Sequence, residues 1–117
     1  MYDENNIFAK IIKGLIPCEK IYEDDTVLFF KDINPFAKIH ILGVPKKPII
    51  DFSDFIFKSN SEEIAEFYKK INMVIEMVGI RENGYKIITN SGDHGRQEVP
   101  HFHIHILGGE KITSKNL

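Results

Sequence analysis

The longest amphipathic pattern in the chain covers residues 61–78. Its apolar residues recur every three or four positions, as on one side of an α-helix; they are Ile64, Phe67, Ile71, Val74, Ile75 and Val78. Gly79 follows at once and suits the left-handed residue that often ends a helix. A shorter pattern of the same kind covers residues 4–13, with Gly14 after it and Pro17 beyond. We therefore expect a short N-terminal helix and a long central helix.

Strand-like segments account for much of the remaining chain. Runs rich in β-branched and aromatic residues, bounded by turn formers, cover residues 20–23, 26–31, 39–44, 85–90 and 99–107. Asp24 and Asp25 suit the turn between the first two strands, and Asn34-Pro35 breaks the chain before the third. This order of elements predicts an α+β fold: an antiparallel sheet with helices packed on one side, in a single domain of residues 1–117.

Composition narrows the functional classes. With 117 residues the chain is one domain with a small core, which pairing with a second copy would help to stabilise. A formal net charge of −2 provides no excess of positive charge for binding polymeric nucleic acid. The single cysteine cannot form a disulfide within the chain, the polar start is unlike a secretory signal, and no apolar run is long enough to span a membrane. We expect a soluble cytoplasmic protein without membrane contact.

Three of the five histidines alternate with apolar residues at 101–105. On a β-strand, alternate side chains share a face and lie roughly 6–7 Å apart. His101, His103 and His105 would then form a row, while Phe102 and Ile104 pack into the core. Because threonine or valine would serve a strand equally well, the row indicates chemistry rather than folding.

The residues alone leave three interpretations of this row open. Two imidazoles could share a metal with Asp93, His94 or Glu98 of the preceding loop. An imidazole held at one nitrogen by a backbone carbonyl could instead act as a nucleophile or general base through the other nitrogen. The row could also be a structural strand face that water satisfies.

The loop before the row favours phosphorus chemistry. Residues 90–98 are polar and contain two glycines, which let backbone N–H groups converge on an anion. Arg96 and the amide of Gln97 could add donors to phosphate oxygens. A donor-rich loop leading into an imidazole row favours nucleophilic attack on phosphorus.

At this point the chain resembles a known family. The run at 101–107 resembles the signature of the histidine triad (HIT) superfamily, in which three histidines alternate with apolar residues. The segment 95–100, Gly-Arg-Gln-Glu-Val-Pro, is similar to the glycine-rich approach to that signature. Further matching segments follow the family order at 6–13, 16–17, 22–25, 30–35, 40–47 and 108–109. The ordered set is similar to the histidine triad nucleotide-binding branch, the purine nucleoside phosphoramidases.

The resemblance implies a role for each matching residue. His103 would attack the α-phosphorus and form a transient nucleotidyl-histidine, and His105 would contact the phosphate and help the leaving group depart. His101 and His40 would orient the site from behind. Asp32 would accept hydrogen bonds from the ribose hydroxyls. The implied purine wall is Phe8, Ile11, Phe30 and Ile33, and the implied phosphate contacts are Asn90, Gln97 and the backbone of Glu98. The chemistry of the loop adds Arg96 to the expected nucleotide-binding residues.

Two positions depart from the family pattern. Arg96 stands where this branch usually has glycine, so it would crowd the phosphate pocket or change its charge. Members with a structural zinc carry a cysteine pair near the first helix, whereas this chain has Ala9 in that region. We therefore expect no metal and no other cofactor.

The resemblance also implies a homodimer, in which the long helix and strand 85–90 meet and the sheet continues across the twofold axis.

The implied activity is hydrolysis of the P–N bond of a purine nucleoside phosphoramidate, which releases a nucleoside monophosphate and an amine. A dinucleoside polyphosphate hydrolase would use the same triad. The remaining alternatives are a nucleotide-binding regulatory protein with incidental turnover and a metal-binding protein.

Overall fold

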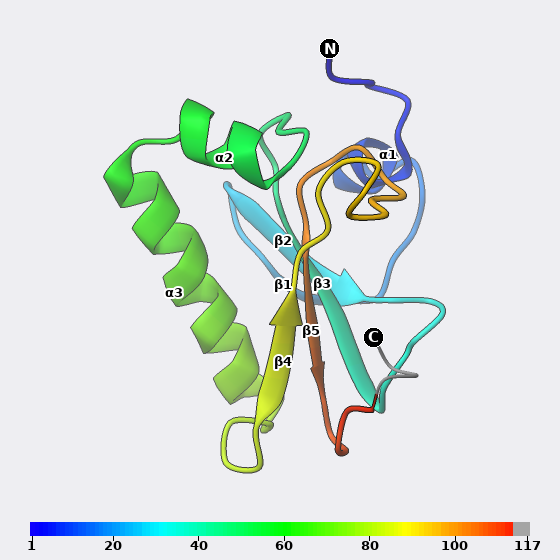
Figure 1. The fold of residues 1–117 in the computed structure, drawn as a ribbon, viewed down its shortest axis with the longest axis vertical. Helices are drawn as coiled ribbons and strands as arrows, with labels where there is room; N and C mark the ends of the chain where they lie inside the picture. The colour runs from blue at the N-terminus through cyan, green and yellow to red at the C-terminus, as the bar shows by residue number, and fades with distance from the viewer. Residues whose placement is uncertain (114–117) are drawn as a thin grey trace.

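One antiparallel sheet organises the computed structural model, which describes residues 1–113. Within these residues the strand order is β1-β2-β3-β5-β4 (Figure 1). The strands are β1 (Lys20–Glu23), β2 (Val27–Lys31), β3 (Ile39–Pro45), β4 (Tyr85–Ile88) and β5 (Ile104–Gly108). The helices are α1 (Ile7–Ile12), α2 (Phe52–Lys58) and α3 (Ser61–Met77). The predicted α+β fold with an antiparallel sheet is confirmed.

Strand β2 is buried on both faces of the sheet. Val27 and Phe29 belong to the core beneath α2 and α3, whereas Leu28 and Phe30 belong to a second core with α1. Successive side chains of a strand point to opposite faces, so a run with four apolar residues in a row needs cover on both sides. The expectation of helices on one side is therefore wrong for α1, which lies across the sheet from α3 (Figure 1).

The long helix has the ends that its sequence predicts. The Asn60 side chain accepts a hydrogen bond from the Glu63 N–H, and the Glu63 side chain accepts one from the Asn60 N–H, forming a capping box. The predicted stripe supplies its buried residues, which are Phe67, Ile71, Val74 and Ile75. Gly79 has a φ of 73°, as expected for a left-handed residue after the helix.

Helix α2 lies in a segment for which the sequence pattern predicts no element. It has seven residues, and Phe55 is its buried residue, so there is no repeat from which a helical period could be read. The ring of Phe55 stacks on that of Phe102 with centroids 4.8 Å apart. This helix therefore packs against the segment that carries the histidines.

The last strand begins five residues later than expected. Pro100 has no N–H to donate, and the His101 N–H donates to the Val99 carbonyl at 2.8 Å. The Phe102 N–H donates to the carbonyl of Ile49, also at 2.8 Å, rather than to a strand partner. His101 and His103 therefore precede β5 and do not form the predicted strand row; of the three histidines, His105 stands on the strand.

Strand β4 is also shorter than the predicted segment 85–90. It ends at Ile88, and the hydroxyl of Thr89 then donates to the His103 carbonyl at 2.7 Å.

Among residues 1–113, no helix combines the length and apolar character needed to cross a membrane.

Candidate active site

A cavity of about 640 Å³ gathers most of the predicted site residues. It contains the whole predicted purine wall, namely Phe8, Ile11, Phe30 and Ile33. Asp32 lines the same cavity. Its further polar lining consists of Lys31, Asn34, Asn90, Arg96, Glu98, His103 and His105. One cavity thus brings together an apolar wall, two acidic residues and two imidazoles.

The hydrogen bonding of His103 determines which of its nitrogens is free to react. Its Nδ1 lies 2.6 Å from the carbonyl oxygen of His101, and a carbonyl can only accept, so Nδ1 carries the proton. Nε2 therefore has an available lone pair. The His103 side chain is buried, with the residue 6% exposed, and its ring is nearly perpendicular to that of Phe8, with the centroids 4.8 Å apart. Burial lowers the pKa of His103, so its imidazole is neutral at pH 7.

His101 is held through both of its ring nitrogens. Nε2 donates to the Pro45 carbonyl at 2.7 Å, which leaves Nδ1 to accept a hydrogen bond from the Tyr2 hydroxyl. The residue is completely buried, and burial lowers its pKa to about 4. Its ring therefore stays neutral and cannot turn without losing two hydrogen bonds. This fixes the backbone whose carbonyl holds His103.

His40 determines the proton position on His105. The Phe36 N–H donates to His40 Nδ1 at 3.0 Å, so the His40 proton is on Nε2. That Nε2 lies 2.9 Å from His105 Nδ1 and 3.5 Å from an oxygen of Asp32. His105 Nδ1 is then the acceptor, and its own proton is on Nε2. Burial, with His103 and His40 nearby, lowers the pKa of His105 to about 4.

The two cavity imidazoles therefore have complementary roles. His103 presents a lone pair, and His105 presents an N–H donor. Their ring centroids are 5.1 Å apart, closer than the row expected from strand geometry. A phosphorus atom between them could be attacked by one ring while the other donates to the departing group. His101 and His40 do not line the cavity. The His101 carbonyl bonds to the ring of His103, and His40 Nε2 bonds to the ring of His105.

A metal does not suit the donor set of this site. Potential ligand atoms of Asp32, His40 and His105 lie within 4.8 Å of one another, the one such group within residues 1–113. A metal on His40 Nε2 would move the ring proton to Nδ1, where it would face the Phe36 N–H. Asp93, His94 and Glu98, the loop ligands considered from the sequence, do not form such a group among the described residues.

Gln97 serves the loop rather than the cavity. Its side-chain oxygen accepts from the Gly92 N–H at 2.9 Å, and its Nε2 donates to the carbonyls of Ile50 and Val99 at 2.8 and 3.0 Å. Gln97 is also absent from the cavity lining. The expected contact between this amide and a phosphate is not supported. Asn90 does line the cavity, while its Nδ2 donates to the Gly95 carbonyl at 2.8 Å.

Sequence reasoning missed Tyr2 and part of the apolar wall. Nothing in the polar start of the chain signals that a hydroxyl there reaches a histidine 99 residues later. The apolar lining residues that were not predicted are Ile7, Ile16, Pro17, Phe36, Leu42 and Val99. Ile7 and Ile16 could have been found from the sequence, because they lie just before and a few residues after the predicted wall residues Phe8 and Ile11.

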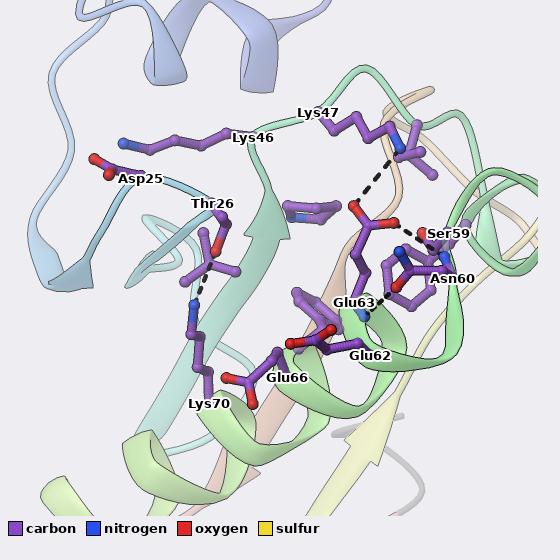
Figure 2. Close-up of a pocket in the computed structure, with 15 residues that line it drawn as sticks. Asp25, Thr26, Lys46, Lys47, Ser59, Asn60, Glu62, Glu63, Glu66 and Lys70 are labelled. Carbon is purple, nitrogen blue, oxygen red and sulfur yellow. Dashed lines mark hydrogen bonds and ion pairs between the residues drawn. The ribbon is translucent and has the colours of Figure 1, made fainter.

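A second cavity, of about 380 Å³, lies on the other face of the sheet between the β2 and β3 ends and the α2–α3 junction (Figure 2). Its lysines are paired: Lys46 with Glu23 at 2.7 Å, Lys47 with Glu63 at 3.9 Å, and Lys70 with Asp24 at 2.9 Å. Its lining contains none of the predicted catalytic or binding residues. The candidate active site is therefore the cavity with the histidines.

Comparison with known proteins gives a consistent family. The model of the HIT domain matches residues 13–112. An uncharacterized HIT-like protein of Rickettsia prowazekii is 46% identical over 112 residues, which cover 96% of this chain and 93% of the relative. The purine nucleoside phosphoramidase of Escherichia coli is 38% identical over 109 residues, 93% of this chain and 91% of the relative.

Solved structures agree with these matches. A histidine triad protein from Clostridium difficile superposes with a TM-score of 0.85 at 40% identity, covering 97% of this chain and 98% of that chain. A HIT family hydrolase from Clostridium thermocellum gives a TM-score of 0.82 at 40% identity, covering 98% and 99%. The chain therefore belongs to the HIT domain family and to the histidine triad superfamily, with relatives in its nucleotide-binding branch.

Proposed function

We propose that this protein hydrolyses the P–N bond of purine nucleoside phosphoramidates, releasing a nucleoside monophosphate and an amine. The observation that carries the proposal is the His103 Nδ1 bond to the His101 carbonyl, which leaves Nε2 unprotonated on a ring that lines the cavity. Two relatives support it by name, a HIT family hydrolase and a purine nucleoside phosphoramidase at 38% identity. The relative at 46% identity carries no named activity.

The proposed reaction has two steps. In the first, His103 Nε2 bonds to the α-phosphorus as the P–N bond to the amine breaks, and the departing nitrogen gains one proton from solvent, relayed through His105 Nε2, so that the His105 ring is neutral before and after the step. In the second, water attacks the phosphorus, the bond to His103 breaks, and the proton of the water returns to solvent. One water is consumed, and one monophosphate and one amine are released.

The proposed nucleotide pose follows the chemistry of the cavity lining. A purine between Phe8, Ile11, Phe30 and Ile33 buries its flat apolar faces. Asp32 accepts the ribose hydroxyls through its carboxylate, one oxygen of which also accepts from the Asn34 N–H at 2.8 Å. The phosphate lies near the two imidazoles, in a cavity that Asn90 and Glu98 also line.

We further propose a cytoplasmic homodimer whose sheet continues through β4. This strand pairs with β5 and is the last in the described sheet order, so its outer edge is unpaired there. Tyr85 and Ile87 on this strand are 42% and 43% exposed, and Tyr68 and Met77 of α3 are 42% and 54% exposed. A second copy would cover these side chains and the open strand edge.

Single-turnover hydrolysis tests the activity. Wild type, His103→Ala and His94→Ala are mixed in excess with an adenosine 5′-phosphoramidate and, separately, with a diadenosine polyphosphate. His94 is exposed and outside the cavity, so it is the matched control. We expect fast P–N cleavage by wild type and His94→Ala, none by His103→Ala, and slow polyphosphate turnover. Faster cleavage of the polyphosphate would favour the alternative hydrolase, and tight AMP binding without any cleavage would favour a binding protein.

A further inference from the structure

We infer that Arg96 selects substrates whose leaving group carries an anionic oxygen group close to the bond that breaks. This inference rests on the proposed function and specifies its substrate class. The group is a carboxylate on the departing amine or a further phosphate, because a guanidinium binds both in the same two-pronged way.

The backbone at Arg96 is the first observation. Its φ is 60°, and it is the one residue other than glycine with a positive φ among residues 1–113. Glycine adopts this conformation without the steric cost that a Cβ brings. The surrounding turn is intact, with the Arg96 N–H donating to Asp93 and the Gln97 N–H to Gly92. Arginine at this position therefore carries a backbone cost that glycine would avoid, which indicates that its side chain has a function.

The depth of the reacting groups is the second observation. His103 is 6% exposed, whereas Arg96 is an exposed residue that lines the same cavity. In displacement at phosphorus the attacking and leaving atoms are roughly in line, on opposite sides of the phosphorus. A nucleophile on a buried ring therefore directs the leaving group towards solvent, and Arg96 is one of the exposed residues of the lining that such a group can meet.

The charges of the lining are the third observation. Lys31 and Arg96 are the cavity's two lysine and arginine residues, and Lys31 is paired with Glu19 at 2.8 Å. Within residues 1–113 the Arg96 guanidinium has no ion-pair partner. Both cavity imidazoles are neutral at pH 7, because burial lowers their pKa values. Arg96 is thus the cationic side chain of this lining that has no ion-pair partner among residues 1–113, in a lining whose carboxylates are Asp32 and Glu98.

A matched pair of substrates isolates this contact. Adenosine 5′-phosphoramidates of glycine and of glycinamide differ in the leaving group by one carboxylate. The ratio of their kcat/KM values is measured for wild type, Arg96→Gly and Arg96→Lys. Comparing ratios between variants cancels the different intrinsic reactivity of the two amines. Arg96→Gly suits the positive φ at this position, so the variant is expected to fold.

We expect Arg96→Gly to lower the glycine-to-glycinamide ratio about three- to fivefold, the scale of an exposed ion pair. Arg96→Lys should retain part of the preference, since lysine keeps the charge but lacks the two parallel N–H donors of the guanidinium. Added salt should reduce the wild-type ratio and leave that of Arg96→Gly nearly constant. A diadenosine polyphosphate measured alongside identifies the anion. If Arg96→Gly lowers kcat/KM more for this substrate, the contact is with a phosphate; if it lowers kcat/KM more for the glycine compound, the contact is with a carboxylate.

Other outcomes would overturn the inference. Equal ratios in wild type and Arg96→Gly, with both substrates slowed alike, would mean that Arg96 serves the α-phosphate or the loop alone. That result leaves the proposed function standing. Cleavage of none of the three substrates by wild type would instead overturn the proposed function, and the leaving-group preference with it.

Discussion

His103 donates its Nδ1 proton to the carbonyl oxygen of His101, at a distance of 2.6 Å. This bond spans two residues and fixes the tautomer and the direction of the imidazole that we propose as the nucleophile. The His101 backbone is fixed in turn through its own ring, which Pro45 and Tyr2 hold at opposite nitrogens. The reactivity of one side chain therefore depends on its neighbour His101 and on contacts from two distant parts of the chain.

Tyr2 is expected to act as a positioning residue. In Tyr2→Phe the buried Nδ1 of His101 loses its donor, which should lower the free energy of unfolding by about 1 kcal/mol. Tyr22→Phe removes a hydroxyl that donates to Asp24 at 2.8 Å, away from the histidines, and serves as the control for kcat. Urea unfolding measures the stability, and kcat should fall while KM for the nucleotide stays nearly constant. A Tyr2→Phe protein with both stability and kcat of wild type would show that this bond contributes little.

His40 is expected to matter most when the leaving group needs a proton. Its Nε2–H holds His105 in the tautomer that donates to the departing nitrogen. In His40→Ala, cleavage of an alkylamine phosphoramidate should slow by about tenfold or more. Cleavage of an adenylate with an acidic phenol as leaving group should slow much less, because a phenolate departs without a proton. Equal slowing of both substrates would contradict this role.

The buried histidines make stability depend on acid pH. Their pKa values are lowered in the folded protein, to about 4 for His101 and His105, while an unfolded histidine titrates near 6.5. Between these values the unfolded chain binds more protons, so the free energy of unfolding falls as the pH drops from 6.5 to 4. Each such histidine contributes on the order of 1 kcal/mol per pH unit in this window. Urea midpoints between pH 7 and 4 measure the effect; a midpoint that stays constant across this window would be inconsistent with buried neutral imidazoles.

The open edge of β4 predicts where dimerisation can be blocked. Ile87→Lys places a charge on this strand and should yield a monomer, because charged residues at an exposed edge oppose strand pairing. Ile56→Lys, on the similarly exposed surface of α2, should leave the dimer intact. Light scattering coupled to size-exclusion chromatography gives the masses. A monomeric wild type, or a dimeric Ile87→Lys, would rule out an assembly through this edge.

Much of the fold could be predicted from the periodic spacing of apolar residues and from the ordered segments that match the family. The α3 stripe is read directly from its spacing, because a long helix presents several turns of the same pattern. The residues of the predicted purine wall could be named because each lies in a segment that matches the family, and all four line the cavity. The cover on both faces of β2 was also visible in principle, since Val27-Leu28-Phe29-Phe30 has no polar alternation.

The features that escaped prediction depend on contacts between distant residues. The late start of β5 results from the Phe102 N–H pairing with Ile49, which no local pattern around the histidines reveals. Gln97 was expected to hold a phosphate, yet it bonds to Ile50 and Val99. The hydroxyl of Tyr2 reaches His101 across 99 positions of sequence. Local propensity describes elements well, whereas these hydrogen bonds arise only once the elements have packed.

The covalent intermediate tests the central claim most directly. Wild type and His103→Ala are quenched with an alkaline denaturant during a single turnover of an adenosine 5′-phosphoramidate, because the P–N bond of a nucleotidyl-histidine is labile in acid. The intact proteins and their peptides are kept at alkaline pH and analysed by mass spectrometry. We predict that wild type gains the mass of one nucleotidyl group, mapped to His103, and that His103→Ala gains none. Phosphoramidate cleavage without an adduct at any quench time, or an adduct mapped to His105, would contradict the account.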